Sequence, residues 1–209
     1  MLVRPCSTDY DEQGRIQGTL DIPLNAQGSA SAQQLAEQLR PLNISLIYSS
    51  PSQSAWQTAS AIGELLDLKV KKVDSWQNVD HGLWQGMLID DIRRKHPKVF
   101  RQWQEQPENI CPPEGETLGD AQVRARAALE KLVRKQKAGA IALVVPEPLA
   151  AIVRSLLVQG QIGDSCKRKS SCGSWELVEL AAPPVHYRGA TVKTEKNGVP
   201  APTMPIGLN

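Results

Sequence analysis

Side chains capable of chemistry stand at two points where predicted strands end. Arg4 and Cys6 follow the apolar pair Leu2–Val3, and Glu147 follows the apolar run Ala140–Val145. The carboxyl ends of parallel strands share one edge of a sheet, and ligands bind in the crevice beyond that edge. We therefore expect Arg4 and Glu147 to meet at one site. There Arg4 either binds an anion or pairs with Glu147, because a buried arginine needs a partner.

Cys6 is the candidate nucleophile at this site. An adjacent arginine lowers the pKa of a thiol and so favours the reactive thiolate. However, no histidine stands near Cys6 in the sequence, and the Cys-x5-Arg loop with which cysteine phosphatases bind phosphate is absent. Most lone cysteines are small inert residues, and the sequence favours this interpretation of Cys6.

The histidines and cysteines offer little for metal or acid–base chemistry. We expect His81 to be a solvated residue of a loop near the rim of the site and His96 to mark a helix break, and His186 lies in the C-terminal tail. The four cysteines are widely spaced and form no C-x-x-C pair, so no metal and no cofactor is expected. Reduced thiols in the cytoplasm are the predicted state.

Several short segments together resemble the histidine phosphatase superfamily, the phosphoglycerate-mutase-like proteins. The matching segments are Arg15-Ile16-Gln17-Gly18, Pro23-Leu24-Asn25, Tyr48-Ser49-Ser50-Pro51, Gln57-Thr58-Ala59 and Pro112-Pro113-Glu114-Gly115-Glu116-Thr117. The resemblance covers residues 1–180 and implies a three-layer α/β/α sandwich with a mostly parallel central sheet. For members of this family it also implies phosphoryl transfer through a histidine that attacks phosphorus.

The same resemblance implies that four residues central to the family's reaction are replaced here. The family's Arg-His-Gly is Arg4-Pro5-Cys6, and the side chain of Pro5 has no lone pair with which to attack phosphorus. The family's Ser-His-Gly is Pro146-Glu147-Pro148, and a carboxylate repels phosphate. A phosphate-binding arginine is replaced by Ser54, and an acid is replaced by Asn78, which cannot protonate a leaving group at neutral pH.

The replacements at Pro5, Ser54, Asn78 and Glu147 favour a catalytically inactive family member, a binding or regulatory pseudoenzyme. Two alternatives stay open. One is a divergent phosphatase or phosphomutase that hydrolyses phosphate esters weakly through a substitute nucleophile, for which Cys6 is the candidate. The other is a structural or assembly protein that acts through its surface and its tail.

A ligand site that survives the replacements is expected to bind a small anion or a phosphorylated molecule weakly. Arg4 and Glu147 cancel in charge, whereas the family's two arginines and one glutamate leave a net positive charge. The expected contacts are Arg4, Ser7, Arg15, Asn78 and Glu147. We expect Arg15 mainly to organise its mobile loop.

Alternating apolar patterns predict the elements that would position this site. Strands are expected at Leu2–Val3, Ile44–Tyr48, Lys69–Val73, Ala140–Val145 and Trp175–Leu180. Helices are expected from a cap at Ser29 or Ser31 through Leu42, from Pro51 to Leu66, over Ile89–Trp103 with a break at Pro97, over Leu118–Lys137 with Thr117 as cap, and over Leu149–Val158. Loops are expected at 7–28 and 74–86, and a Pro/Gly-rich tail at 181–209 follows the domain 1–180.

Three tryptophans near the site have different expected roles. Trp76 and Trp84 stand in the loop close to the site, where a tryptophan either stacks on a ligand or packs in the core, and core packing is the more common role. Trp56 stands at a position that is expected to be exposed, and an exposed tryptophan indicates a contact surface.

Composition limits the classes of partner. The chain has 209 residues, 41% of them hydrophobic and 22% charged, and a formal net charge of +2, which predicts one globular cytoplasmic domain. Neither this balance nor the short run Lys167-Arg168-Lys169 favours nucleic acid as a partner. No apolar run reaches the roughly 18 residues of a membrane span, and the N-terminus does not resemble a signal peptide. A protein partner and a homodimer are left open.

Overall fold

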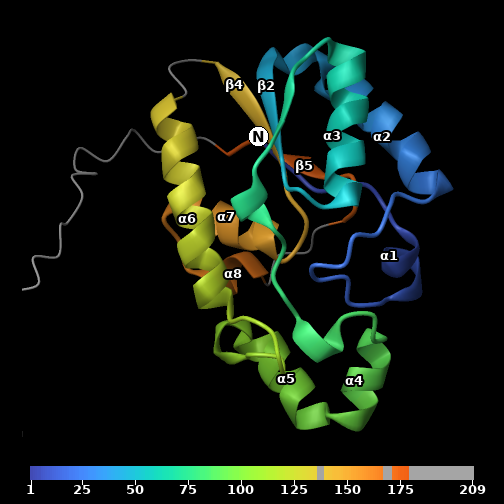
Figure 1. Ribbon diagram of the computed structural model, residues 1–209, viewed down its shortest axis with the longest axis vertical. Coiled ribbons are helices and arrows are strands. Elements are labelled where there is room, and N and C mark those ends of the chain that lie inside the picture. The colour runs from blue at the N-terminus through green and yellow to red at the C-terminus, as the bar shows by residue number, and fades with distance from the viewer. Residues whose placement is uncertain (136–138, 167–170, 179–209) are drawn as a thin grey trace, which may run out of the picture.

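The computed structural model describes residues 1–135, 139–166 and 171–178. A five-stranded sheet of order β3-β2-β4-β1-β5 forms its centre (Figure 1). The strands are β1 (Leu2–Val3), β2 (Ile44–Ser49), β3 (Val70–Lys72), β4 (Ala140–Val144) and β5 (Trp175–Glu176). β5 runs antiparallel to β1, and the other neighbours are parallel. The prediction of a mostly parallel sheet is confirmed.

Helices cover both faces of this sheet (Figure 1). α2 (Ala26–Leu39) and α3 (Gln53–Leu66) pack together on one face, and α6 (Leu118–Lys135) and α7 (Leu149–Val158) pack together on the other. The shorter helices are α1 (Asp9–Gln13), α4 (Ile89–Lys95), α5 (Pro97–Glu105) and α8 (Ile162–Cys166). The predicted three-layer α/β/α sandwich is therefore confirmed.

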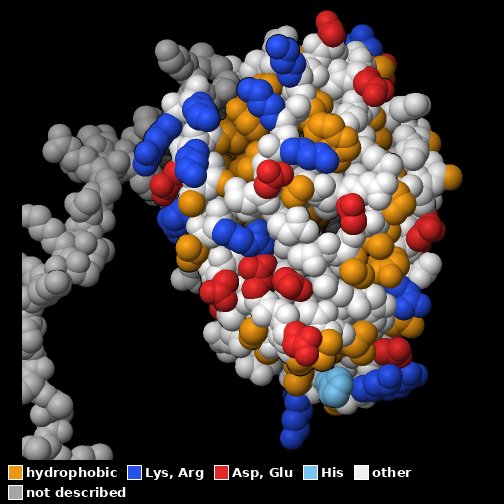
Figure 2. Space-filling model, viewed as in Figure 1, with side chains coloured by type: hydrophobic (Ala, Val, Ile, Leu, Met, Phe, Trp, Pro, Cys, Tyr) orange, Lys and Arg blue, Asp and Glu red, His pale blue; other side chains and the backbone are white. Residues whose placement is uncertain are grey.

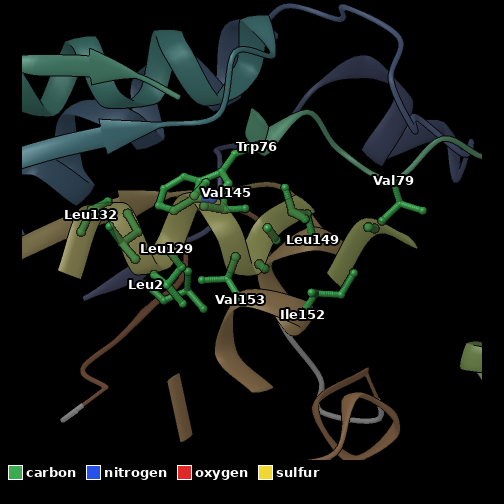
Figure 3. Close-up of a cluster of buried hydrophobic side chains, with 14 of the residues drawn as sticks. Leu2, Trp76, Val79, Leu129, Leu132, Val145, Leu149, Ile152 and Val153 are labelled. Carbon is green, nitrogen blue, oxygen red and sulfur yellow. The ribbon is translucent and has the colours of Figure 1, made fainter. Parts of the chain in front are cut away.

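The two central strands send alternate side chains into two separate cores. Val3 and Val144 belong to the cluster under α2 and α3, whereas Leu2 and Leu143 belong to the cluster under α6 and α7. A strand buried on both faces is apolar at every position, which explains why its sequence shows a continuous apolar run. Figure 3 shows Trp76 in the second cluster, so its predicted place in the core is confirmed.

Helix α2 starts earlier than predicted. The side chain of Asn25 caps it by accepting a hydrogen bond from the Gly28 amide at 2.7 Å. The predicted cap at Ser29 or Ser31 is therefore wrong. A cap depends on which side chain reaches a free amide, and apolar spacing does not reveal this.

Helix α3 begins after Pro51 rather than at it. Its first residue is Gln53, whose amide donates to Asp21 Oδ1 at 2.6 Å. This cap comes from a loop far away in sequence.

Farther along α3, Trp56 is only partly exposed, and Lys72 Nζ lies 4.6 Å from its ring centroid. Trp56 is thus covered in part by a cation, and it is less open than predicted.

Helix α6 begins at Leu118 as predicted and is described as far as Lys135, and the last two residues of the predicted helix, 136 and 137, lie outside the described residues. Thr117 caps α6, since its Oγ1 accepts a hydrogen bond from the Asp120 amide at 3.1 Å. Helix α7 has the predicted bounds, Leu149–Val158. The two edge strands β3 and β5 are shorter than predicted, and Leu177 beyond β5 is 62% exposed.

Two short helices were not predicted. α1 forms inside the expected loop 7–28 through a capping box, in which Thr8 and Asp11 exchange hydrogen bonds between side chain and backbone. It has no buried residue, so apolar periodicity cannot reveal it. α8 follows α7 closely and packs against it.

The predicted helix Ile89–Trp103 breaks at Pro97, as expected, into α4 and α5. These two helices lie together at one end of the molecule, beyond the sheet (Figure 1). They pack around a third cluster in which Ile16, Trp84 and Ile92 are buried and Trp103 is partly buried. The predicted packing role of Trp84 is confirmed.

The remaining predictions concern the surface and the termini. On the face seen in Figure 2, basic and acidic side chains are interspersed from the top of the molecule to the bottom. No helix in the part of the chain that the structure describes is long and apolar enough to cross a membrane. The tail 181–209, His186 and Lys167–Lys169 lie outside the described residues.

Candidate functional site

The carboxyl ends of β1 and β4 lie side by side and face a cleft of about 620 Å³. The amide of Val145 donates to the carbonyl of Val3 at 3.0 Å, which aligns the two strand ends. This is the edge of the sheet at which the sequence placed the site. Residues from the strand ends, from α1 and from α5 contribute to its lining, among them Arg4, Pro5, Cys6, Asp11, Arg15, Ser54, His81, Trp103, Glu147 and Cys172.

Arg4 is 8% exposed and pairs with two carboxylates. Its Nε donates to Glu147 Oε1 at 3.0 Å, and its Nη1 lies 2.8 Å from Glu176 Oε1. Glu176 also accepts a hydrogen bond from Arg154 Nε at 3.0 Å. The predicted pairing of Arg4 with Glu147 is therefore present in the structure, and its alternative role in binding an anion stays a prediction.

The formal charges of the network Arg4, Glu147, Glu176 and Arg154 cancel. Burial by itself would raise the pKa of Glu176, but the hydrogen bonds and charges of Arg154 and Arg4 outweigh burial and hold this pKa below its usual value. Glu176 is therefore ionised at neutral pH and keeps Arg4 engaged. A guanidinium engaged in this way offers an anion less attraction than a free arginine fork.

Glu147 combines a structural contact with exposure to the cleft. Its Oε2 accepts a hydrogen bond from the Ala151 amide, in the first turn of α7, at 3.1 Å. A carboxylate at this end of a helix is favoured by the helix dipole. The side chain is 36% exposed and also lines the cleft, so its negative charge faces any ligand there.

Pro5 and Ser54 both reach the cleft lining. The carbonyl of Pro5 accepts a hydrogen bond from the Gly173 amide at 2.9 Å, which ties β1 to the turn before β5. Ser54, near the start of α3, is 1% exposed. Neither side chain carries a charge or a nitrogen lone pair, so neither supplies a nucleophile or an anion clamp.

Asn78 and Ser7 are outside the residues that line the cleft. Asn78 Nδ2 donates to the carbonyls of Gly18 at 3.1 Å and Glu147 at 2.9 Å. Among the described residues its Oδ1 has no hydrogen-bond partner, although it is buried. Ser7 Oγ donates to Asn25 Oδ1 at 3.3 Å. Both residues hold the walls of the cleft in place, and their role as ligand contacts stays a prediction.

Arg15 lines the cleft but is engaged in holding its own loop. Its Nη1 donates to the carbonyl of Gly86 at 2.6 Å, and its Nε donates to Gln13 Oε1 at 2.7 Å. This agrees with the predicted role of organising the loop. Any contact with a ligand would have to compete with these bonds.

Cys6 is buried and poorly suited to attack the phosphorus of a ligand in the cleft. It is 1% exposed, and burial raises the pKa of its thiol, an effect that a hydrogen bond with Thr58 only partly offsets. The reactive form of cysteine is the thiolate, which a raised pKa disfavours. The geometry therefore agrees with the inert interpretation of Cys6.

The prediction that His81 is a solvated loop residue is wrong. His81 is 6% exposed, and the ring of Trp103 packs edge-on against it with centroids 5.9 Å apart. Burial lowers its pKa, although the charges of Asp80 and Glu116 oppose this shift. Its Nδ1 is buried without a hydrogen-bond partner among the described residues. His81 is thus a neutral imidazole in the cleft wall at neutral pH.

The loss of stability in mild acid should depend on His81. Because its pKa is lower in the folded protein than in the unfolded chain, the unfolded chain binds this proton first as the pH falls. The contribution of neutral His81 to the free energy of unfolding is complete above about pH 6.5. Below that pH it is lost, by no more than about 1.4 kcal/mol for each pH unit. Urea unfolding at about pH 7.5 and about 5.5 should show a smaller loss in His81→Gln than in the wild type.

The exposed His96 offers a matched control for this measurement. His96→Gln should keep the wild-type difference between the two pH values. Equal losses in all three proteins would contradict a buried, neutral His81.

The sequence did not identify several residues of the site. Trp103 lines the cleft, and its ring centroid lies 5.6 Å from that of Trp84. The sequence did contain a signal for its burial: Val99, Phe100 and Trp103 recur at helical spacing, and in α5 they share the face that packs into the third cluster. Among the residues described, no group of three or more His, Cys, Asp or Glu is placed to hold a metal ion.

Comparisons with known proteins agree with this architecture. The model of the histidine phosphatase superfamily (branch 1) matches residues 1–179. "Phosphoserine phosphatase 1" of Hydrogenobacter thermophilus is 36% identical over 159 residues, which is 75% of each chain. "Uncharacterized phosphatase PhoE" of Bacillus subtilis is 32% identical over 131 residues, 63% of this chain and 62% of that protein.

Solved structures show the same likeness. The structure of mycobacterial glucosyl-3-phosphoglycerate phosphatase in complex with VO3 superposes with a TM-score of 0.77 at 27% identity. The match covers 83% of this chain and 89% of that one. The structural likeness therefore extends over most of this chain.

Proposed function

Because the chain belongs to the histidine phosphatase superfamily, we propose that it uses the family's cleft to bind a ligand without the family's phosphohistidine reaction. The observation on which this proposal rests is the position of Pro5 beside Arg4, whose Nε and Nη1 are paired with carboxylates. Pro5 cannot attack phosphorus, and Arg4 is held by Glu147 and Glu176. The domain would then act as a binding or regulatory module in the cytoplasm.

The charge of the cleft supports weak rather than tight binding of anions. Glu147 presents a carboxylate where the resemblance implies a second histidine, and Ser54 stands where it implies an arginine. Among the described residues of the lining, Arg15 is the other arginine, and it holds its own loop. A phosphorylated ligand would have to displace one of these pairings.

A divergent phosphatase is the second candidate, and the comparisons support it more directly than the first. The relatives at 36% and 32% identity both carry the name of a phosphatase. His81 is a better substitute nucleophile than Cys6, because a neutral imidazole has a free ring lone pair whereas a protonated thiol does not react. Its place in the cleft wall is the observation that favours this candidate.

A hydrolysis assay separates the two candidates. We expect the purified chain to hydrolyse an aryl phosphate, phosphoserine and phosphoglycerate no faster than Arg4→Lys, which keeps the charge next to Glu147 and Glu176 but loses the planar fork. Calorimetry with inorganic phosphate should then show weak binding without turnover. Turnover that Arg4→Lys or His81→Gln abolishes would overturn the proposal and establish the divergent phosphatase.

A further inference from the structure

We propose that Cys6 and Cys172 form a reversible disulfide across the wall of the cleft when the protein meets an oxidised thiol pool. Both residues line the cleft, and both are free thiols in the structure. The inference does not depend on the proposed function, because it concerns the two sulfur atoms and the backbone that carries them.

The backbone brings the two cysteines together from opposite ends of the chain. Beyond the paired strands β1 and β5, the Arg4 amide donates to the carbonyl of Ser174 at 2.9 Å. The Gly173 amide then donates to the carbonyl of Pro5 at 2.9 Å. The first bond joins residues two positions from Cys6 and Cys172, and the second joins residues adjacent to them, so the two segments are fixed against each other.

The sulfur of Cys6 faces the turn that carries Cys172. A Cβ atom placed on Gly173 would lie 3.2 Å from Cys6 Sγ. Gly173 has a φ of +69° and lies between Cys172 and Ser174, whose amide closes the turn by donating to the carbonyl of Ser171 at 3.1 Å. A disulfide requires Cα atoms about 4.4–6.8 Å apart. We infer that a small adjustment of this turn brings Cys172 within that distance of Cys6.

The two thiols differ in access, and this difference sets the order of events. Cys172 is exposed, whereas Cys6 is buried. Although the residue is exposed as a whole, protein atoms around its sulfur partly exclude water. This desolvation, with the nearby charges of Asp11 and Cys6 and a hydrogen bond to Asp11, raises the pKa of Cys172 to about 12. Both thiols are therefore protonated at neutral pH, so exchange is slow there and accelerates about tenfold per pH unit up to that range.

The reaction that closes the bridge balances with glutathione disulfide as the oxidant. The Cys172 thiolate attacks one sulfur of the oxidant, a mixed disulfide forms, and one glutathione thiolate leaves. The Cys6 thiolate then attacks the Cys172 sulfur, the bridge forms, and the second glutathione leaves. Two protein thiols are oxidised by two electrons, one glutathione disulfide is reduced to two thiols, and the two protons go to the leaving thiolates.

The bridge would covalently join the two segments that hold Arg4. One segment carries Arg4 itself, and the other leads into β5, which carries Glu176. Oxidation would therefore lock the floor of the cleft and stabilise the fold, because a bridge between such distant residues restricts the unfolded chain.

Thiol counting after equilibration with glutathione tests the proposal. The full chain is incubated at about pH 8 in buffers from fully reduced to fully oxidised glutathione, quenched with acid, denatured and alkylated with N-ethylmaleimide. The reduced chain should take up four labels, one for each cysteine in the sequence. The oxidised monomer should take up two fewer, and peptide mapping should place the bridge between Cys6 and Cys172.

Variants provide the controls. Cys6→Ser and Cys172→Ser should each take up the same number of labels in oxidised as in reduced glutathione. Cys111→Ser, at an exposed cysteine, should still take up two fewer labels when oxidised. The melting temperature should rise on oxidation in the wild type and in Cys111→Ser alone. Four free thiols at every glutathione ratio, a bridge to Cys111 or Cys166, a covalent dimer or a persistent mixed disulfide would each overturn the proposal.

Discussion

Replacing Arg4 with alanine should lower the free energy of unfolding by about 3 kcal/mol. The Arg4 side chain is 9% exposed and lies between the carboxylates of Glu147 and Glu176. Its removal takes away the cation that these two carboxylates share, whereas Glu176 keeps its ion pair with Arg154. Removing one partner of a buried ion pair is costly because the desolvated charge that remains is no longer compensated.

Urea denaturation followed by circular dichroism measures this loss. The matched control is Arg40→Ala, because Arg40 pairs with Glu37 on the surface and both side chains are more than half exposed. Surface pairs contribute less than about 1 kcal/mol. Adding Glu147→Gln to Arg4→Ala should recover part of the lost stability. A loss in Arg4→Ala no larger than in Arg40→Ala would mean that the network does not hold the floor of the cleft.

The sequence predicts the central strands and the paired helices well because burial on both faces leaves a local signal. β4 is apolar at every position, and its two cores require this. The pairing of Arg4 with Glu147 was also open to prediction, since both follow strands that end at the same edge. Here the topology of a parallel sheet turns two distant sequence positions into neighbours.

Other parts of the site depend on contacts that no local pattern reveals. Glu176 meets Arg4 only because β5 adds antiparallel to β1 at the sheet edge. His81 is buried because Trp103, from a helix after a break, packs over it. The sequence predicts a polar histidine in a loop to be exposed. Whether it is buried depends on which apolar side chains from other elements pack against it.

The same limit applies to the question of activity. The resemblance identifies what Pro5 and Glu147 replace, but the chemistry of a cleft depends on where all of its charges lie. The structure adds Glu176 and Arg154 to Arg4 and Glu147, and so changes a predicted ion pair into a network of four groups. The affinity of the cleft for anions then depends on whether the charge of one carboxylate in this network can be removed while the other ion pairs stay in place.

Glu147→Gln should strengthen the binding of inorganic phosphate by at least about tenfold, or about 1.4 kcal/mol. A unit charge roughly 5 Å from an anion in a partly wet site contributes about 3 kcal/mol of repulsion. Because the Glu147 side chain is 36% exposed, we expect solvent to screen about half of this. Glutamine can still accept the hydrogen bond from Arg4 or from the Ala151 amide, so the fold of the cleft is retained.

Titration calorimetry of inorganic phosphate into the wild type and the variant gives the ratio of dissociation constants. Glu37→Gln is the matched control, because it makes the same change of charge at an exposed side chain of α2, where salt screens the charge from the cleft. It should leave the affinity for phosphate unchanged. If Glu147→Gln and Glu37→Gln bind phosphate equally, the carboxylate of Glu147 does not face the anion site, and Arg4 is kept from anions by Glu176 alone.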